Sequence, residues 1–195
     1  MPRKRQTTTQ RIVKAAWNLF YKKGYDGTTV EDIIAASKTS KRTFYPYFQR
    51  KEALLNSLSD LFDEKYEELI SEMDPAMSVY DKLLYLNREL FYMIETSVDI
   101  KLLASLYSSQ LITKDHKSLS DSGRFYFKLL NEILSDGLES GEFKNTSTSI
   151  ELMQIYAMFE RAMIYDWVLF DGAYSLTEYS SQLLPHVLDT FVNGV

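Results

Sequence analysis

Apolar residues recur every three or four positions along most of the chain, which is the spacing of a helix face and not of a strand. In the first such stretch, Ile12, Ala15, Ala16, Leu19 and Phe20 fall on one helical face. Glycine and proline are scarce, at 7 and 4 of 195 residues, so few positions interrupt this pattern. The sequence therefore predicts an all-α protein of about nine helices with short connections.

Two short helices are predicted after the first one. Residues 28–31 have the pattern of a capping box between Thr28 and Glu31, which predicts a second helix from Thr29. Residues 37–39 predict a tight turn, and residues 40–45 a short third helix. Such a pair of helices is typical of a helix-turn-helix. We therefore predict a three-helix N-terminal head with the motif at about residues 29–48, followed by a C-terminal helical bundle.

The remaining apolar stripes predict six further helices in the bundle. Asp74 and Pro75 together predict an N-cap and a first-turn proline for the second of these helices. A capping box at Ser175 is expected to open the last helix, and Pro185 to bend it. The expected positions are 50–73, 75–96, a helix through 102–107, 118–140, 147–170 and the stretch after 175.

Charge divides the chain into a basic N-terminal part and an acidic remainder. Residues 1–51 hold twelve lysines and arginines against three acidic residues, whereas the rest holds ten against 24. Positive charge attracts DNA phosphates. We expect a DNA-binding domain at 1–52 and a ligand-binding and dimerisation domain at 53–195. The basic segment from Arg3 to Arg5 is either a tail or an arm that reaches the minor groove.

The third predicted helix carries the side chains best suited to reading DNA. The second helix of a helix-turn-helix enters the major groove, where Arg42 can make two hydrogen bonds to a guanine. Lys41 suits a phosphate equally well, and residues beside the motif can hold the DNA backbone. The expected DNA-binding residues are Thr28, Thr29, Ser40, Lys41, Arg42, Thr43, Tyr45, Tyr47 and Lys51.

The second domain is rich in aromatic residues, which line either a core or a ligand pocket between helices. For any single residue the core is the better interpretation, but as a set these residues predict a pocket for a small apolar or aromatic effector. The expected ligand-binding residues are Phe91, Tyr92, Leu103, Tyr107, Tyr126, Tyr156 and Phe159.

The helix at 147–170 is apolar around most of its circumference, so other helices or a partner subunit must cover it. DNA half-sites one turn apart require a two-fold dimer, and we expect the last two helices to form it. The expected residues of this homodimer interface are Met163, Trp167, Phe170, Leu184, Leu188 and Phe191.

Several functional classes are excluded or disfavoured. The chain has no cysteine and only two distant histidines, His116 and His186, so we expect no disulfide, no metal site and no cofactor. Glu160 and Asp166 are expected to be surface or ion-pair groups, and no catalytic constellation or phosphate loop is present, which argues against an enzyme. Without a signal peptide or membrane-spanning segment, the protein is expected to be cytoplasmic, with no membrane partner.

The stretch from Ile12 to Leu55 resembles the DNA-binding head of TetR-type regulators. Ser37-Lys38-Thr39 stands where this family commonly has Ala-Gly-Val, and Arg42 where it has glycine. The loss of the turn glycine predicts a strained residue at Lys38, at a cost of about 1 kcal/mol, or a different turn. The matching positions are Ala15-Ala16, Leu19-Phe20, Gly24, Thr28-Thr29-Val30, Asp32-Ile33, Ser40, Thr43-Phe44-Tyr45, Tyr47-Phe48 and Lys51-Glu52.

The resemblance implies nine helices, a homodimer formed largely by the last two, an inducer pocket within helices four to eight, and repression. We therefore predict a sequence-specific transcription regulator that a small molecule releases from a palindromic operator. Two alternatives stay open: a DNA-binding activator without an inducer, and a protein-interaction module whose head does not read DNA. The presence of Lys41, Arg42, Tyr45 and Lys51 argues against the second alternative.

Overall fold

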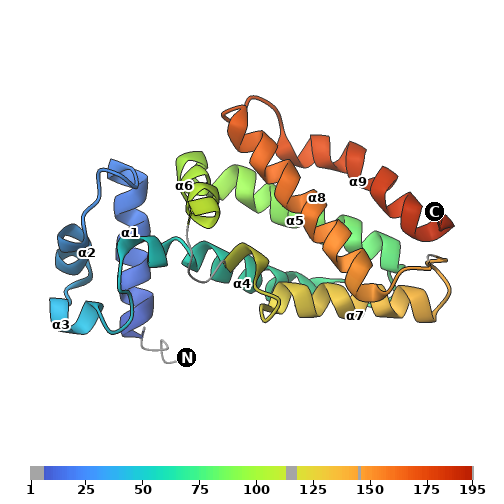
Figure 1. The fold of residues 1–195 in the computed structure, drawn as a ribbon, viewed down its shortest axis with the longest axis horizontal. Coiled ribbons are helices and arrows are strands. Elements are labelled where there is room, and N and C mark those ends of the chain that lie inside the picture. Colours follow the sequence, from blue (N-terminus) through green and yellow to red (C-terminus); the bar gives the residue numbers. More distant parts are fainter. Residues whose placement is uncertain (1–6, 113–117, 145, 195) are drawn as a thin grey trace. The chain divides into compact units, whose positions relative to one another are not determined.

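The computed structural model describes residues 7–112, 118–144 and 146–194, and every regular element in these ranges is a helix. The nine α-helices within these described ranges confirm the predicted all-α fold (Figure 1). The predicted arm from Arg3 to Arg5 lies outside the described residues. The elements are α1 Thr8–Lys23, α2 Val30–Ser37, α3 Lys41–Phe44, η1 Lys51–Leu54, α4 Ser57–Glu72, α5 Val79–Ser97, α6 Ile100–Ile112, η2 Ser118–Ser120, α7 Phe125–Glu139, α8 Ser149–Leu169 and α9 Leu176–Asn193.

The chain forms two compact units, which are described separately. The first unit comprises the described residues of 1–60 and 99–119, and the second those of 61–98 and 120–195. Helix α6 therefore belongs to the same unit as the helix-turn-helix, although some fifty residues separate them in sequence. The predicted functional boundary after residue 52 divides the chain differently and stays a prediction.

The first unit has its core between α1 and α2. Ile12, Ala16 and Phe20 are the buried residues of α1, as the apolar stripe predicted, and Ile33 of α2 is fully buried. Phe44 at the end of α3 is fully buried too, and its ring packs against that of Phe48, with 5.7 Å between the ring centroids. Both helices of the helix-turn-helix, α2 and α3, thus contribute buried side chains to the core of the first unit.

Helix α2 begins one residue later than predicted. Thr29 is its N-cap: the Thr29 hydroxyl accepts from the backbone N–H of Asp32 at 3.1 Å, and the Asp32 carboxylate accepts from that of Thr29 at 3.0 Å. The predicted capping box of Thr28 and Glu31 is therefore wrong. The Thr28 side chain is buried and donates its hydroxyl to the carbonyl oxygen of Gly24 at 2.8 Å, so it cannot cap α2.

The turn between α2 and α3 keeps the conformation that a glycine would adopt there. Lys38 has φ 53° and ψ 44°, which is left-handed backbone, and its N–H donates to the carbonyl oxygens of Ala35 and Ile34. The strained residue predicted at this position is confirmed. The strain costs roughly 1–2 kcal/mol in a residue with a Cβ.

Gly27 allows the segment after α1 to pass close to the end of that helix. A Cβ atom on Gly27 would lie 2.4 Å from the carbonyl oxygen of Lys23, a backbone atom that cannot rotate away. Gly27→Ala should therefore lower the free energy of unfolding by about 1–3 kcal/mol, as overpacking does. Urea denaturation followed by circular dichroism measures this. In the control Gly123→Ala, the added Cβ meets only the flexible Asp121 side chain, and equal stability of the two variants would refute the close approach.

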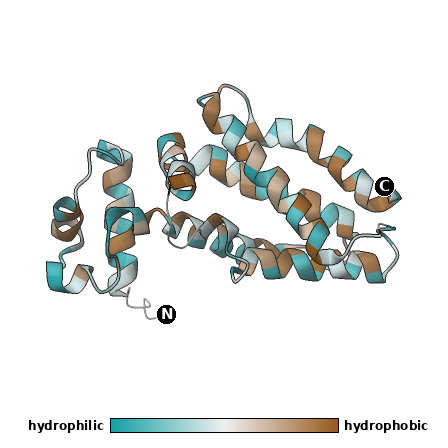
Figure 2. Ribbon diagram, viewed as in Figure 1, coloured by the Kyte–Doolittle hydropathy of each residue, from teal (hydrophilic) through white to brown (hydrophobic). Residues whose placement is uncertain are grey.

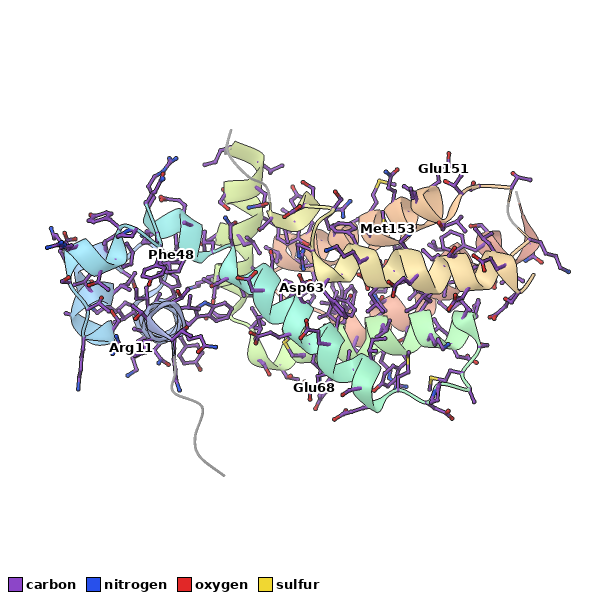
Figure 3. The ribbon with its side chains drawn as sticks, turned by 90° about the horizontal axis from the view of Figure 1, so that it is seen from below. Arg11, Phe48, Asp63, Glu68, Glu151 and Met153 are labelled. Atoms are coloured by element: carbon purple, nitrogen blue, oxygen red, sulfur yellow. The ribbon has the colours of Figure 1, made fainter. Side chains whose placement is uncertain are left out.

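The second unit is a bundle in which α5 packs on α9 and α7, and α8 packs on α7 and α9. Its helices carry hydrophobic bands between polar stretches (Figure 2). Asp63, labelled on α4 in Figure 3, accepts two hydrogen bonds from the guanidinium of Arg124, at 3.1 and 2.6 Å. No helix in the described ranges is long and apolar enough to cross a membrane.

Two helices of this unit start later than predicted. Helix α5 begins at Val79 because Ser78 caps it and the Glu142 carboxylate accepts from the backbone N–H groups of Val79 and Tyr80, at 2.9 and 2.8 Å. Asp74 instead closes a turn by accepting from the N–H of Ala76 at 2.9 Å. Likewise α7 begins at residue 125, because residues 118–120 form a separate 3-10 turn.

Candidate DNA-binding and effector sites

The start of α3 is a polar, exposed segment. The Ser40 hydroxyl accepts from the backbone N–H of Thr43 at 3.1 Å. The hydroxyl oxygens of Ser40 and Thr43 also lie 2.9 Å apart, in a second hydrogen bond. These two residues therefore fix the first turn of the helix. Arg42 is exposed, and among the described residues no carboxylate pairs with it. Its guanidinium is free to meet a partner outside the chain.

Lys41 makes an ion pair with Glu31 of α2, with 2.7 Å between the ammonium nitrogen and the carboxylate oxygen. The hydrogen bond from Lys41 lowers the pKa of the Glu31 carboxyl and raises that of the Lys41 ammonium. Both side chains are exposed, and such surface ion pairs contribute little to stability. A DNA phosphate can replace the Glu31 carboxylate at modest cost.

Two of the side chains predicted to bind DNA, those of Thr28 and Lys51, make contacts within the first unit. Thr28 is buried, as described above. The ammonium of Lys51 donates to the carbonyl oxygen of Tyr25 at 2.7 Å and lies 4.1 Å from the centroid of the Tyr25 ring. By contrast, Thr29, Tyr45 and Tyr47 are exposed. These three side chains and the start of α3 can contact DNA.

The aromatic residues predicted to line one effector pocket are divided between the two units. Leu103 and Tyr107 lie on α6 in the first unit, and the other five lie in the second. Of those five, Phe91, Tyr126 and Tyr156 are buried, Phe159 is half-buried, and Tyr92 is 59% exposed.

A buried carboxylate, that of Glu160, lies at the centre of the second unit, although it was expected at the surface or in an ion pair. Glu160 of α8 is only 3% exposed. Its carboxylate accepts from the hydroxyl of Tyr126 at 2.6 Å, the side-chain amide of Asn87 at 2.9 Å and the hydroxyl of Tyr66 at 3.2 Å. The Ser180 hydroxyl in turn donates to the Asn87 side-chain oxygen at 2.7 Å. This Glu160 network links α4, α5, α7, α8 and α9 through neutral donors.

Burial raises the pKa of the Glu160 carboxyl, while the hydrogen bonds from Tyr126, Asn87 and Tyr66 act in the opposite direction. The folded protein therefore holds this proton more tightly than the unfolded chain does. The contribution of Glu160 to the free energy of unfolding is fully present below pH 4.5, the ordinary pKa of a glutamate carboxyl. It is lost as pH rises from there through the raised pKa of the folded protein.

The variant Glu160→Gln removes this titration. The free energy of unfolding of the wild type minus that of the variant should fall as pH rises above 4.5, because only the wild type must bury a charge. Urea denaturation across pH 4.5 to 7.5 measures it. Glu151→Gln, on the exposed start of the same helix, is the matched control: hydrogen bonds from Thr148 lower the pKa of Glu151, so its difference should stay flat over this range. A flat difference for Glu160→Gln would contradict the expectation.

The residues predicted for the dimer interface are mostly inside the protomer. Of the six, Phe170 is exposed, and Met163, Trp167, Leu184, Leu188 and Phe191 are buried. Helix α8 instead exposes a different row of residues with alternating spacings of three and four, as in a coiled-coil seam. This row, here called the α8 seam, consists of Ile155, Met158, Ala162, Tyr165 and Leu169.

A hollow of about 410 Å³ lies between α5 and α9 in the second unit. Met77, Leu84 and Leu184 give it apolar walls, and Arg88 adds a guanidinium. Asn87 also lines this α5–α9 hollow, so the Glu160 network reaches its wall. Asp81 adds a carboxylate, so the hollow combines apolar surface with charged groups of both signs.

An exposed helix-turn-helix, in a chain whose second unit is a helical bundle, is typical of DNA-binding transcription regulators. A family model described as "Bacterial regulatory proteins, tetR family" matches residues 12–58. A second, "YsiA-like protein, C-terminal region", matches residues 61–190. The chain belongs to the TetR family of bacterial regulatory proteins. This confirms the predicted family, and with it the predicted ligand-responsive DNA-binding repressor.

Relatives resemble the chain over most of its length. The "Fatty acid metabolism regulator protein" of Bacillus subtilis is 25% identical over 189 residues, which cover 94% of this chain and 93% of that protein. QacR of Staphylococcus aureus is 24% identical over 139 residues, covering 68% and 72% of the two chains.

Solved structures share the fold. FadR from Bacillus subtilis in complex with stearoyl-CoA has a TM-score of 0.69 at 23% identity, with coverage of 96% of this chain and 99% of that one. FadR from Thermus thermophilus in complex with lauroyl-CoA has a TM-score of 0.71 at 22% identity, with coverage of 91% and 92%.

Proposed function

We propose that this chain is a homodimeric repressor whose effector is a long-chain acyl-CoA. The similarity to the fatty acid metabolism regulator supports this proposal, because the match covers 94% of the chain and therefore includes the C-terminal residues after the head. Some other relatives match only the N-terminal head: the regulator YuxN of Bacillus subtilis is 44% identical, but over 54 residues. We place the effector site within residues 53–195, so only a relative that matches these residues indicates which ligand is bound.

The α5–α9 hollow has the chemistry that an acyl-CoA requires. An acyl chain gains free energy from apolar walls such as those of Met77, Leu84 and Leu184. The coenzyme carries phosphates, and an arginine guanidinium binds phosphate through paired hydrogen bonds. Arg88 now bonds the neighbouring Glu89 carboxylate at 2.9 and 3.0 Å in a surface pair that a phosphate can replace. We place the acyl chain in this hollow and the phosphates beside Arg88.

The head is proposed to read the operator through residues that are exposed or, in the case of Thr43, half-buried. Arg42 would contact base edges, and Lys41 a phosphate. Thr28 and Lys51 are left out of this proposed set because their side chains are engaged within the unit. The remaining proposed DNA contacts are Thr29, Ser40, Thr43, Tyr45 and Tyr47.

The homodimer is proposed to form through the α8 seam together with Phe170 and Tyr179. Soluble monomers rarely expose so many large apolar side chains in one row. A two-fold axis would bring each seam against its copy and bury both.

Isothermal titration of the purified chain with stearoyl-CoA and lauroyl-CoA tests the effector. We expect one bound ligand per subunit, with free CoA binding far more weakly because it lacks the apolar chain. Arg88→Ala should weaken acyl-CoA binding about tenfold, and Lys128→Ala, which changes an exposed cation on α7, should not. If neither acyl-CoA binds a dimer that still binds DNA, the effector is wrong and the regulator assignment stands.

A further inference from the structure

We propose that Glu160 is a positioning residue of the repressor: its buried carboxylate fixes α4 against α5 and α9, and a ligand between α5 and α9 releases α4 by breaking this arrangement. The proposal rests on the proposed function in one respect, because it takes the α5–α9 hollow as the effector site. It adds the residues that connect this hollow with α4.

Helix α4 has residues in both units. Residues 57–60 belong to the first unit and the rest of the helix to the second. At the start of α4, the hydroxyl of Ser57 accepts from the indole N–H of Trp17 at 2.8 Å, and Trp17 lies on α1, which packs on α2. A helix is held by hydrogen bonds along its whole length, so a displacement of its second part is passed on to its start. Helix α4 can therefore carry a change from the second unit to the helix-turn-helix.

Tyr66 anchors α4 in the core of the second unit. It is 1% exposed, and its ring lies 5.1 Å from that of Tyr126, measured between the centroids. Its hydroxyl donates to the Glu160 carboxylate of α8 at 3.2 Å. Because both residues are buried, water cannot readily replace either partner of this hydrogen bond. The position of α4 therefore depends on the Glu160 carboxylate.

The same carboxylate is bound to the two helices that form the hollow. The Ser180 hydroxyl of α9 donates to the side-chain oxygen of Asn87 on α5 at 2.7 Å, and the Asn87 amide donates to Glu160 at 2.9 Å. Leu84 and Leu184 line the hollow from these same two helices. Asn87 is only 1% exposed, so a ligand acts on it by changing the spacing of α5 and α9, which the Ser180–Asn87 hydrogen bond joins.

The Glu160 carboxylate is sensitive to the loss of any one donor. The groups that stabilise its charge are all neutral: the hydroxyls of Tyr66, Tyr126 and Tyr156 and the amide of Asn87. A buried charge without a cation depends on every hydrogen bond that it receives, and a partly satisfied buried network is less stable than a complete one. The network therefore has a complete and a broken arrangement, and intermediate ones are unfavourable.

The charged groups near the network act on Tyr126 rather than on the carboxylate. Arg124, which is paired with Asp63, lies 5.7 Å from the centroid of the Tyr126 ring, and Arg161 acts electrostatically on the Tyr126 hydroxyl. Burial raises the pKa of each of the three tyrosines that face Glu160, so their hydroxyls stay protonated. Within the network, the Glu160 carboxyl is therefore the group that titrates in the acidic range.

The two arrangements correspond to the two states of a repressor. A ligand that enters between α5 and α9 favours the broken network, and an inducer must favour the state that releases the operator. The complete network therefore belongs to the operator-binding state. A variant that lacks the donor on α4 should resemble the induced protein even without an effector.

Fluorescence anisotropy without any effector tests this, using an operator selected from random duplexes. Tyr66→Phe keeps the ring and removes the donor, so it should weaken operator binding about tenfold. Binding to random duplex, which requires only the charge of the head, should not change. Ser180→Ala, which removes the donor to Asn87, should weaken operator binding as well. Tyr92→Phe, at an exposed tyrosine of α5, is the matched control and should bind as the wild type does. Wild-type operator affinity in both Tyr66→Phe and Ser180→Ala would overturn the proposal.

The pH profile separates this role from a merely structural one. The broken arrangement leaves the carboxylate with fewer donors, so the pKa of Glu160 is higher there, and operator binding releases a proton. The ratio of operator affinity to random-DNA affinity should therefore fall several-fold as pH is lowered from about 7.5 to about 5.5. It should fall less in Glu160→Gln, which lacks the titrating group. Equal pH profiles of the two proteins would contradict the proposed role of Glu160.

Stearoyl-CoA distinguishes a failure of this proposal from a failure of the proposed effector. It should weaken operator binding by a smaller factor in Tyr66→Phe than in the wild type, and by the wild-type factor in Tyr92→Phe. Equal factors in all three proteins would overturn the connection through Glu160. If stearoyl-CoA does not change operator binding by the wild type, the effector is wrong, and the two effector-free measurements still decide the role of Glu160.

Discussion

Replacing Leu169 with glutamate should convert the dimer into monomers and lower operator affinity at least about a hundredfold. Leu169 is 60% exposed at the end of the α8 seam. Two-fold symmetry would bring this position close to the partner's seam, so the variant buries carboxylates in an apolar interface without a cation. Loss of the dimer removes the second head, and with it the advantage of binding two half-sites on one DNA molecule.

Sedimentation equilibrium gives the oligomeric state of this variant, and fluorescence anisotropy with labelled operator gives its affinity. Tyr92→Glu is the matched control because Tyr92 is equally exposed, at 59%, but lies on α5 outside the seam. The control should stay dimeric and bind the operator as the wild type does. A Leu169→Glu protein that remains a dimer with unchanged operator affinity would refute the proposed interface.

Arg42→Ala should lower the ratio of operator affinity to random-DNA affinity by about ten- to a hundredfold. Arg42 is exposed on α3 and has no carboxylate partner among the described residues, so its two hydrogen bonds to a guanine cost no internal contact. Since the contact is to a base, its loss should affect specific binding far more than binding to random sequence. Anisotropy titrations on both kinds of duplex measure the ratio.

Lys41→Ala provides the comparison on the same helix. A phosphate contact carries no sequence information, so this variant should weaken binding to both duplexes alike and reduce the salt dependence by about one counterion. The two substitutions are thus distinguished by selectivity and by salt. An unchanged affinity ratio in Arg42→Ala would mean that this guanidinium does not read the operator.

The helical period of the sequence was sufficient to predict the fold, since each helix has an apolar face of its own. The residue at which a helix begins was harder to predict. Both Thr28 and Thr29 can cap a helix, and the tertiary burial of Thr28 decides between them. The start of α5 depends on Glu142, some sixty residues away, which no local pattern reveals.

The sites were predicted less completely for a similar reason. Helix α8 is apolar on two faces, and periodicity does not tell which face packs inside the protomer and which is exposed. A signal for Glu160 was present, because it lies at helical spacing from the buried residues Tyr156, Met163 and Trp167. Its three donors come from helices distant in sequence, so only the fold reveals the network.

In the proposed function, a long-chain acyl-CoA releases the dimer from its operator. The measurement that tests it most directly is the affinity for stearoyl-CoA with and without saturating operator DNA, using a palindrome recovered by selection from random duplexes. We predict that the operator weakens stearoyl-CoA binding by the same factor by which stearoyl-CoA weakens operator binding, as linkage requires. Equal stearoyl-CoA affinity in the presence and absence of operator would contradict the claim.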